Sequence, residues 1–383
     1  MESKYKTPGQ LLNALLEQKG WTKRVLAIVL DMSEGAVNKL ASDKQKFTAE
    51  IAISLEEVLG ESADLFVELQ KSLDLSVARI KAIPNPGQAT RAHLFSELPI
   101  SEMIKRGWLH ADNIKDVKNI EIGLCSFFEA NQINEIEILP HAAKKTKVAL
   151  GTTSVQLAWL YRVKQISAEI IAPKYSTRSV TAAIEKLKPL RISAEATRKV
   201  PRILAEAGIR FVIVESLPSA KIDGVCMWLD EFSPVVGMSL RFDRIDNFWF
   251  VLRHELEHIL CEHGKNKINI DTELSELRAN SEENINEEER EANSAASEFM
   301  VPIKRIDSFI ARKAPAFSER DLIGFSRTIG VHPGLVVGQL QYKSNRYNIF
   351  RNHLVKVREY VCPSAVVDGW GTVAPINHQE NYS

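Results

Sequence analysis

The sequence has few of the features that mark secreted, membrane-bound or disulfide-rich proteins. Only four of its 383 residues are cysteine, and no two of them form a Cys-x-x-Cys pair, which argues against a disulfide framework and against a cysteine zinc site. No apolar run reaches the length of a membrane span, and the first residues lack the apolar core of a signal peptide. We therefore expect a cytoplasmic protein with no membrane partner.

Net charge is also absent from this chain. The 49 Lys and Arg residues balance 49 Asp and Glu residues, so any contact with DNA must come from a local patch. Hydrophobic residues make up 45% of the sequence, an ordinary value for a globular protein, and this length allows two or three domains. The function must therefore be inferred from local motifs.

The most informative motif is His-Glu-x-x-His inside the apolar segment 248–260. Residues four apart on a helix lie one above the other, so His254 and His258 can offer two imidazole nitrogens to one metal ion. Glu255 borders the same face and can accept a proton from water as a general base without being a ligand. The motif predicts a Zn²⁺ site, which needs a third protein ligand and one open position.

The third ligand is predicted by counting along the chain. A metzincin would have a histidine six residues after the second one, where this chain has Gly264, and His263 lies at the wrong helical step. A second helix carries Glu289 and Asn293 on one face, and we expect Glu289 to be the ligand and Asn293 to hydrogen-bond a histidine. Glu291, about 200° around that helix, is the alternative ligand.

The amino-terminal residues have the signals of short, capped helices. Thr7 and Pro8 start a helix whose leucines keep the 3.6-residue period, and a second helix is expected over residues 22–30. Ser33 caps a third helix after a tight turn at Asp31, an aspartate where glycine is usual. Together with two further helical segments, these helices predict a helix-turn-helix bundle.

In a helix-turn-helix, the second helix of the motif enters the major groove of DNA. We expect four side chains near its start to meet base edges and two lysines after it to meet phosphates. The base-reading candidates are Ser33, Glu34, Asn38 and Lys39, and the phosphate-binding candidates are Lys44 and Lys46. A bundle that docks a protein is the alternative, because residues 23–50 carry five basic against four acidic residues.

The amino-terminal region resembles a family of bacterial regulators. Residues 22–75, with the segments 60–66 and 69–70, look like the antitoxin-type, HigA-like subgroup of Xre/Cro-like regulators. The resemblance implies binding to operator DNA as a homodimer.

A linker and a helical middle region are expected next. Residues 81–97 begin with two prolines and a glycine that oppose continued helix, and are interpreted as a linker. Residues 98–204 are predicted to be helical, most clearly over 154–170 and 180–187. Their basic residues, Arg162 among them, are interpreted as a solvated face.

Three strands are predicted just before the histidine helix. They are rich in β-branched residues and cover residues 210–215, 225–229 and 234–240. An edge strand beside such a helix can pair with an extended substrate peptide, and Val235–Leu240 is the predicted edge.

These elements predict an α+β fold in several parts. An all-helical helix-turn-helix domain takes residues 1–80, and the linker and the helical middle region follow it. A zincin-like domain, with a small mixed sheet packed on helices, takes residues 205–345. The tail from 346 to 383 has no pattern that we interpret.

Motifs of the carboxyl-terminal half resemble the ImmA/IrrE family of metallo-endopeptidases, in its version fused to an Xre-type domain. The motifs are residues 221–224, 240–250, 254–258, 291–293 with 300–302, and 331–338. The resemblance implies a zinc peptidase that cleaves a repressor or related regulatory protein under stress or phage challenge. It implies His254, His258 and Glu289 as ligands and supports Glu255 as the base. The sequence departs from the family at Glu257, where a small residue is common.

Other groups complete the expected site. His332, Tyr161 and Arg253 are candidate donors to the charge that develops on the substrate oxygen, although a satisfied loop histidine is the favoured interpretation of His332. The acidic stretch 273–289 is expected to be a mobile loop that acts as a lid.

Three functions compete on this basis. The first is a DNA-binding regulator whose zinc-dependent endopeptidase domain hydrolyses a peptide bond in a partner protein. The second is an antitoxin-like repressor whose zincin domain is a non-catalytic sensor or docking module. The third is a protein whose helix-turn-helix holds a toxin instead of DNA. The complete set of ligands together with Glu255 favours the first.

Overall fold

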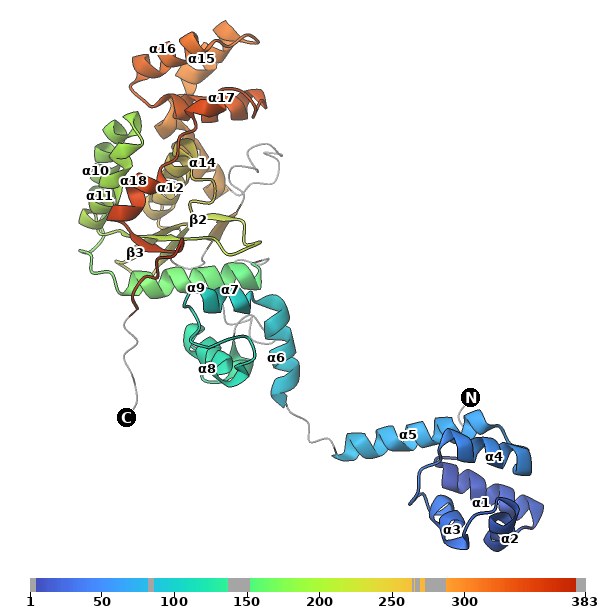
Figure 1. The fold of residues 1–383 in the computed structure, drawn as a ribbon. Helices are drawn as coiled ribbons and strands as arrows, with labels where there is room; N and C mark the ends of the chain where they lie inside the picture. The colour runs from blue at the N-terminus through green and yellow to red at the C-terminus, as the bar shows by residue number, and fades with distance from the viewer. Residues whose placement is uncertain are drawn as a thin grey trace, which may run out of the picture. The chain divides into compact units, whose positions relative to one another are not determined.

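The computed structural model describes residues 5–81, 86–136, 152–263, 265, 269–272 and 287–376, with only the backbone described at 80, 81, 86–90 and 269–272. The chain folds into two compact units, and the boundary between them in the sequence falls between Pro86 and Gly87 (Figure 1). None of the described helices has the length and apolar character needed to cross a membrane.

The first unit is an all-helical bundle. Its helices are α1 (Pro8–Lys19), α2 (Lys23–Val29), α3 (Glu34–Ala41), α4 (Ala49–Leu59) and α5 (Ala63–Lys81). The first four begin at a Thr or Ser whose hydroxyl accepts a hydrogen bond from the backbone N–H three residues later, which satisfies one of the free donors of the first turn. Leucines from these helices form one common core.

The turn between α2 and α3 has the expected tight geometry. Asp31 adopts the left-handed backbone conformation, with φ of 51°, which aspartate tolerates better than most residues. The N–H of Met32 donates to the carbonyl of Ala27 at 2.9 Å, and Val37 and Leu40 are fully buried below the turn. The predicted helix-turn-helix is confirmed.

The second unit is built around a five-stranded mixed sheet with the order β4-β2-β3-β1-β5. The strands are β1 (Arg210–Val214), β2 (Ile222–Trp228), β3 (Pro234–Met238), β4 (Asn269–Thr272) and β5 (Val366–Asp368). β1 runs parallel to β3 and β5, whereas β2 runs antiparallel to β3 and β4. The predicted α+β class and all three predicted strands are confirmed.

The prediction of the edge strand was wrong. Val235–Leu240 falls largely on β3, which lies inside the sheet between β2 and β1. The two outer strands come from segments after the histidine helix, β4 at residues 269–272 and β5 at residues 366–368. Short strands recruited from distant parts of the chain leave too little local pattern to predict.

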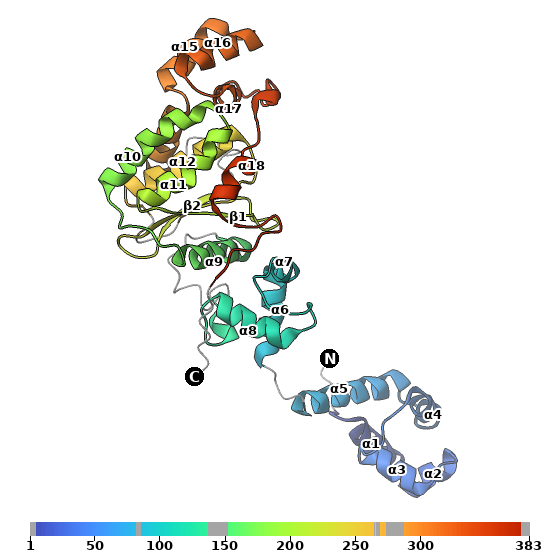
Figure 2. The same cartoon turned by 60° about the vertical axis from the view of Figure 1, so that its left-hand side comes forward.

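Helices cover both faces of the sheet. α9 (Ser154–Ala168) lies on one face, and α10 (Thr177–Leu187), α11 (Val200–Glu206) and α12 (Ile245–Leu260) lie on the other (Figure 2). Alternate residues of β1 pack into the cores on the two faces of the sheet, because successive side chains along a strand point to opposite faces. Phe211 and Ile213 join the core beneath α12, and Val212 and Val214 join the core beneath α9.

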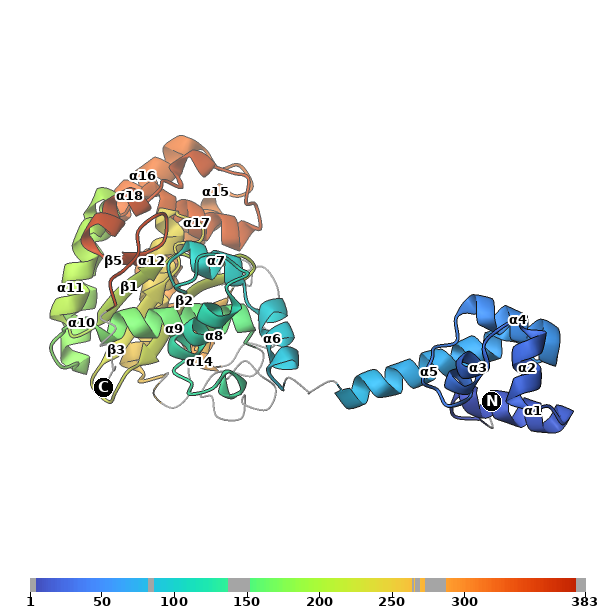
Figure 3. The same ribbon diagram turned by 60° about the horizontal axis from the view of Figure 1, so that its bottom comes forward.

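The segment before α9 is also helical and belongs to the second unit. It contains α6 (Pro86–Glu97), α7 (Ile100–Lys105), α8 (Val117–Phe127) and the 3-10 turn η1 (Ile133–Glu135). Residues 86–97, expected in the linker, instead form α6, whose proline stands at the first helical position where its missing N–H is tolerated. Leu94 of α6 is buried in the core beneath α9. Figure 3 shows α6, α7 and α8 next to α9.

The remaining elements follow α12 or bridge α10 and α11. The helices are α14 (Glu287–Met300), α15 (Ile303–Lys313), α16 (Glu319–Ile329), α17 (Pro333–Ser344) and α18 (Arg358–Val361). The 3-10 turns are η3 (Lys188–Ile192), η4 (Glu195–Lys199), η6 (Arg351–His353) and η7 (Cys362–Ser364).

A buried charge pair fastens the carboxyl-terminal strand to the sheet. Asp368 accepts hydrogen bonds from Nε1 of Trp108 at 2.8 Å and from Nε of Arg162 at 2.9 Å. Arg162 also donates to the carbonyl of Ala374 at 3.2 Å. The interpretation of Arg162 as part of a solvated face was therefore wrong, because its side chain is only 5% exposed and its charge is neutralised inside the core by Asp368.

Candidate metal centre

The histidine helix α12 is buried along most of its length. Apolar residues including Phe250, Val251 and Leu252 pack it into the core on one face of the sheet. As a consequence, His254 and Glu255 have no exposed surface and His258 is 3% exposed. Burying polar side chains is unfavourable unless they find partners or bind a ligand, so this cluster marks α12 as a functional helix.

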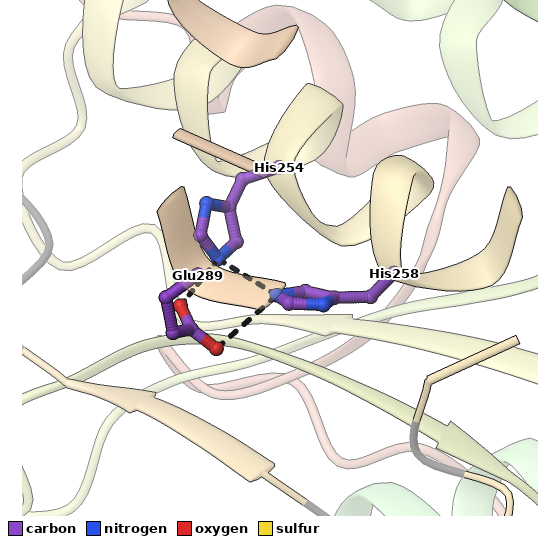
Figure 4. A group of neighbouring side chains, drawn as sticks. All are labelled: His254, His258 and Glu289. Carbon is purple, nitrogen blue, oxygen red and sulfur yellow. Dashed lines mark hydrogen bonds and ion pairs between the residues drawn. The ribbon is translucent and has the colours of Figure 1, made fainter. Parts of the chain in front are cut away.

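The first turn of α14 brings an acidic group to the two histidines. Oε2 of Glu289 lies 3.2 Å from Nε2 of His254, and Oε1 of Glu289 lies 3.4 Å from Nε2 of His258 (Figure 4). The two histidine Nε2 atoms are 3.0 Å apart. Ala292 and Ala296 of α14 are fully buried, and these small residues allow the two helices to approach closely.

The separations fit a tetrahedral metal ion. Ligand atoms about 2.0–2.2 Å from a zinc ion in tetrahedral geometry lie about 3.3–3.6 Å apart. The two histidine nitrogens here are 3.0 Å apart, and they lie 3.2 and 3.4 Å from the two carboxylate oxygens of Glu289, which is close to this spacing. Among the described residues this is the only group of three or more metal-binding side chains that converge in this way. Glu291, the alternative ligand, is exposed and outside the group. The structure thus brings together the three ligands predicted from the sequence.

The predicted base, Glu255, lies directly above a glycine of the sheet. A Cβ atom on Gly224 of β2 would lie 2.3 Å from Oε1 of Glu255 and 2.7 Å from Cγ1 of Val251. No side chain fits there, so Gly224 allows the carboxylate to lie against the strand. This role of Gly224 was not predicted from the sequence, because only the pairing of helix and strand reveals it.

Two other residues near the histidines differ from expectation. Asn293 does not bond a histidine, and its Oδ1 is buried without a hydrogen-bond partner in the described structure. Instead, Nδ1 of His263 lies 3.0 Å from Nδ1 of His258. His263 does not lie on the ligand face of α12, and this part of the prediction holds. The unexpected feature is that the turn after α12 brings the ring of His263 back toward His258.

The three candidate oxyanion donors lie outside this group. His332 caps α17, where its Nδ1 accepts the N–H of Gly334 at 3.0 Å, and burial lowers its pKa. Tyr161 is on α9, across the sheet from α12. Arg253 donates to Glu257 at 2.6 Å, so the unusual Glu257 serves as the partner of a half-buried arginine. Of the expected lid, residues 273–286 lie outside the described residues, and Glu287 to Glu289 begin α14.

The six predicted DNA-contacting residues are all exposed on the first unit. Ser33, Glu34, Asn38 and Lys39 lie at the start or on the outer side of α3, and Ser33 caps it. Lys44 and Lys46 follow in the loop before α4. Lys46 forms an exposed ion pair with Asp74 of α5 at 2.8 Å, which would compete with a phosphate for this lysine.

Comparison with known proteins assigns both parts of the chain. Residues 12–66 match the helix-turn-helix family, and residues 205–315 match the family of the IrrE N-terminal-like domain, of the M78 peptidases. Neither the curated proteins nor the solved structures compared with this chain gave a match. The matched segments contain α3 and the complete histidine-glutamate group, respectively. This protein therefore joins an Xre-like helix-turn-helix domain for DNA binding to a peptidase-family domain of the ImmA/IrrE type.

Proposed function

We propose that the protein is a DNA-binding regulator whose second unit is a zinc-dependent endopeptidase acting on a regulatory partner protein. The observation that carries this proposal is the group of the buried His254 and His258 with the half-buried Glu289, next to the buried Glu255. Two nitrogens and one carboxylate form the ligand set of a hydrolytic zinc site, and an adjacent second carboxylate can serve as its general base. A purely structural metal site would not need the buried carboxylate of Glu255 in addition to its ligands.

In this proposal the residues have separate tasks. A bound zinc ion would supply Lewis acidity toward water and the substrate carbonyl. Glu255 accepts the proton of the attacking water and returns it to the leaving amine. Its position over Gly224 holds the carboxylate in a site from which solvent is excluded. The neighbouring residues therefore orient the carboxylate of Glu255 for proton transfer, whereas the carboxylate of Glu289 is left to bind the metal.

An outer strand near the site offers a place for the substrate backbone. β4 is one of the two outer strands of the described sheet, and its Asp271 pairs with Gly224, directly below Glu255. An extended peptide can add to an outer strand through main-chain hydrogen bonds. We propose this position for the substrate in place of β3, which is enclosed.

The first unit supports DNA binding through α3, and it also supports a second candidate function. α2 exposes a row of apolar side chains at helical spacing, with Ile28 73% and Val29 47% exposed. An exposed apolar row of this kind favours a protein contact. We propose operator binding through α3 as the main role, and contact with a protein partner, a toxin or a second copy of the chain, through α2 as the alternative.

Metal content tests the central part of the proposal. We expect about one zinc per purified chain by elemental analysis, as the single group of ligands requires. Glu289→Ala should lose most of this zinc, whereas Glu291→Ala, an exposed change on the same helix, should keep it. A parent protein without zinc after supplementation would refute the metallopeptidase and direct attention to DNA and protein binding.

A further inference from the structure

His263 is held in place by the strand next to the metal site. It ends the turn after α12, where its N–H donates to the carbonyl of His258 at 2.8 Å. Its own carbonyl accepts a hydrogen bond from Nε1 of Trp228 at 2.9 Å, and Sγ of Cys226 lies 3.8 Å away. Both of these residues belong to β2, so the backbone of His263 is fixed to the sheet as well as to the helix.

The ring of His263 contacts the side of His258 that faces away from the ligand group. Nδ1 of His263 lies 3.0 Å from Nδ1 of His258, whereas Nε2 of His258 points to Glu289 and His254. Nε2 of His263 lies 3.9 Å from Oε1 of Glu288, the residue before the carboxylate ligand. His263 is therefore not a fourth ligand, and it connects α12, β2 and the first turn of α14.

We propose that His263 is a positioning residue that fixes the tautomer and ring orientation of His258 for metal binding. A neutral imidazole has one N–H donor and one acceptor nitrogen. If Nε2 of His258 binds a metal ion, the proton of His258 must be on Nδ1, where the facing Nδ1 of His263 accepts it. The proton of His263 is then on Nε2, the atom that faces the carboxylate of Glu288. All three groups are compatible with this single arrangement.

The inference rests on the proposed metal site and adds a residue to it. Partners of the second ring nitrogen orient a metal-binding histidine, and their loss usually costs about 10–100-fold in metal affinity. In this chain that partner is provided by the turn after the histidine helix, and its anchor is an indole N–H from the sheet. Asn293, the partner expected from the sequence, does not fill this role.

The test is zinc affinity of the full-length protein, measured by competition with a chromogenic chelator. We expect His263→Ala to bind zinc about 10–100-fold more weakly than the parent. His263→Asn, which places an amide oxygen near the position of Nδ1, should recover most of the affinity. Trp228→Phe, which removes the indole N–H that anchors the His263 backbone, should fall between these two. His353→Ala, a change at a histidine paired with Glu319, should have no effect.

The absorption bands of bound cobalt provide a second measurement, because a loss of packing that leaves the ligands in place would not shift them. In the cobalt-loaded protein, His263→Ala should shift the d–d bands because His258 changes orientation, and His263→Asn should restore them. Unchanged affinity and unchanged bands in a folded His263→Ala protein would overturn the role of His263 while the metal site stands. A parent protein that binds neither metal would overturn the metal site and this role together.

Discussion

Gly224 and Glu255 fit each other so closely that a single added carbon on the glycine would lie 2.3 Å from the carboxylate oxygen. The strand thereby provides the space that the proposed base occupies. This contact couples residues 31 positions apart, and it links the shape of the sheet directly to the orientation of Glu255.

Gly224→Ala should damage both the fold and the site. The added methyl group must displace Glu255 or Val251, and overpacking of this kind costs about 1–3 kcal/mol of unfolding free energy. Denaturant unfolding measures this loss. The matched change Gly324→Ala, on the exposed side of α16 where nothing lies within 4 Å, should instead be neutral or stabilise by up to about 1 kcal/mol. Equal effects of the two changes would contradict the close fit.

Glu255→Gln should abolish hydrolysis while zinc remains bound. The amide keeps the size of the side chain but does not accept a proton, and loss of a general base lowers rates by about 10²–10⁴-fold. Cleavage of a peptide library, followed by mass spectrometry, compares the variant with the parent, and elemental analysis checks the zinc. A variant that cleaves as fast as the parent would exclude Glu255 as the base.

Asn38→Ala combined with Lys39→Ala should weaken binding to the gene's own promoter. Both side chains are on the outer side of α3, and one good contact to a base edge contributes about 1–3 kcal/mol, which corresponds to about 5–150-fold in affinity. A gel-shift titration at fixed salt measures it. Asp74→Asn should have the opposite effect, because it releases Lys46 for a phosphate. If the double variant binds as well as the parent, α3 does not read this DNA.

Asp368→Ala should destabilise the second unit selectively. The change leaves Arg162 buried without its counter-charge, and breaking such a pair costs about 3–5 kcal/mol. Five of the six tryptophans are in the second unit, so tryptophan fluorescence during denaturant unfolding reports mainly on it. Glu206→Gln, which breaks an exposed pair with Arg202, is the control and should leave the transition unchanged. A small loss of unfolding free energy in Asp368→Ala would show that Arg162 finds water or another partner.

Stability should fall in mild acid partly because of His332. Burial, followed by the nearby His353, lowers the pKa of His332 below its ordinary value of 6.5, whereas Glu195 raises it. The unfolded chain therefore takes up a proton before the folded one does, so stability is lost as the pH falls below about 6.5 toward the folded pKa. His332→Asn retains a residue suited to capping α17 and should lose less stability between pH 7 and 5. Parallel pH profiles of the two proteins would contradict this assignment.

Local signals in the sequence were enough for much of the fold and for the ligand group. Thr7 and Ser33 cap the helices that their hydroxyls predict, because a cap acts within three residues. The two histidines proposed as ligands share a helix, and Glu289 was chosen because it shares one face of a second helix with Asn293. These features depend on helical periodicity, which a sequence displays directly.

The parts that the sequence did not reveal depend on contacts between distant segments. β4 and β5 are four and three residues long and show no alternation of their own. Arg162 resembled its lysine neighbours until Asp368, more than two hundred positions later, accounted for its burial. His263 was assessed as a helical residue, but the helix ends at Leu260 and the turn that follows changes the direction of its side chain.

The pairing of β1 with β5 also determines which of the two units can complete its fold first during protein synthesis. Residues 210–214 leave the ribosome long before residues 366–368, and at about 5–20 residues per second the delay is roughly 8–30 s. During that interval Arg162 has no counter-charge and the sheet lacks its last strand, whereas the helix-turn-helix unit is already complete. A nascent chain can therefore present the surface that we propose for DNA binding before the peptidase-family domain has completed its fold. Protein made without β5 would retain the first unit and lack a finished second one.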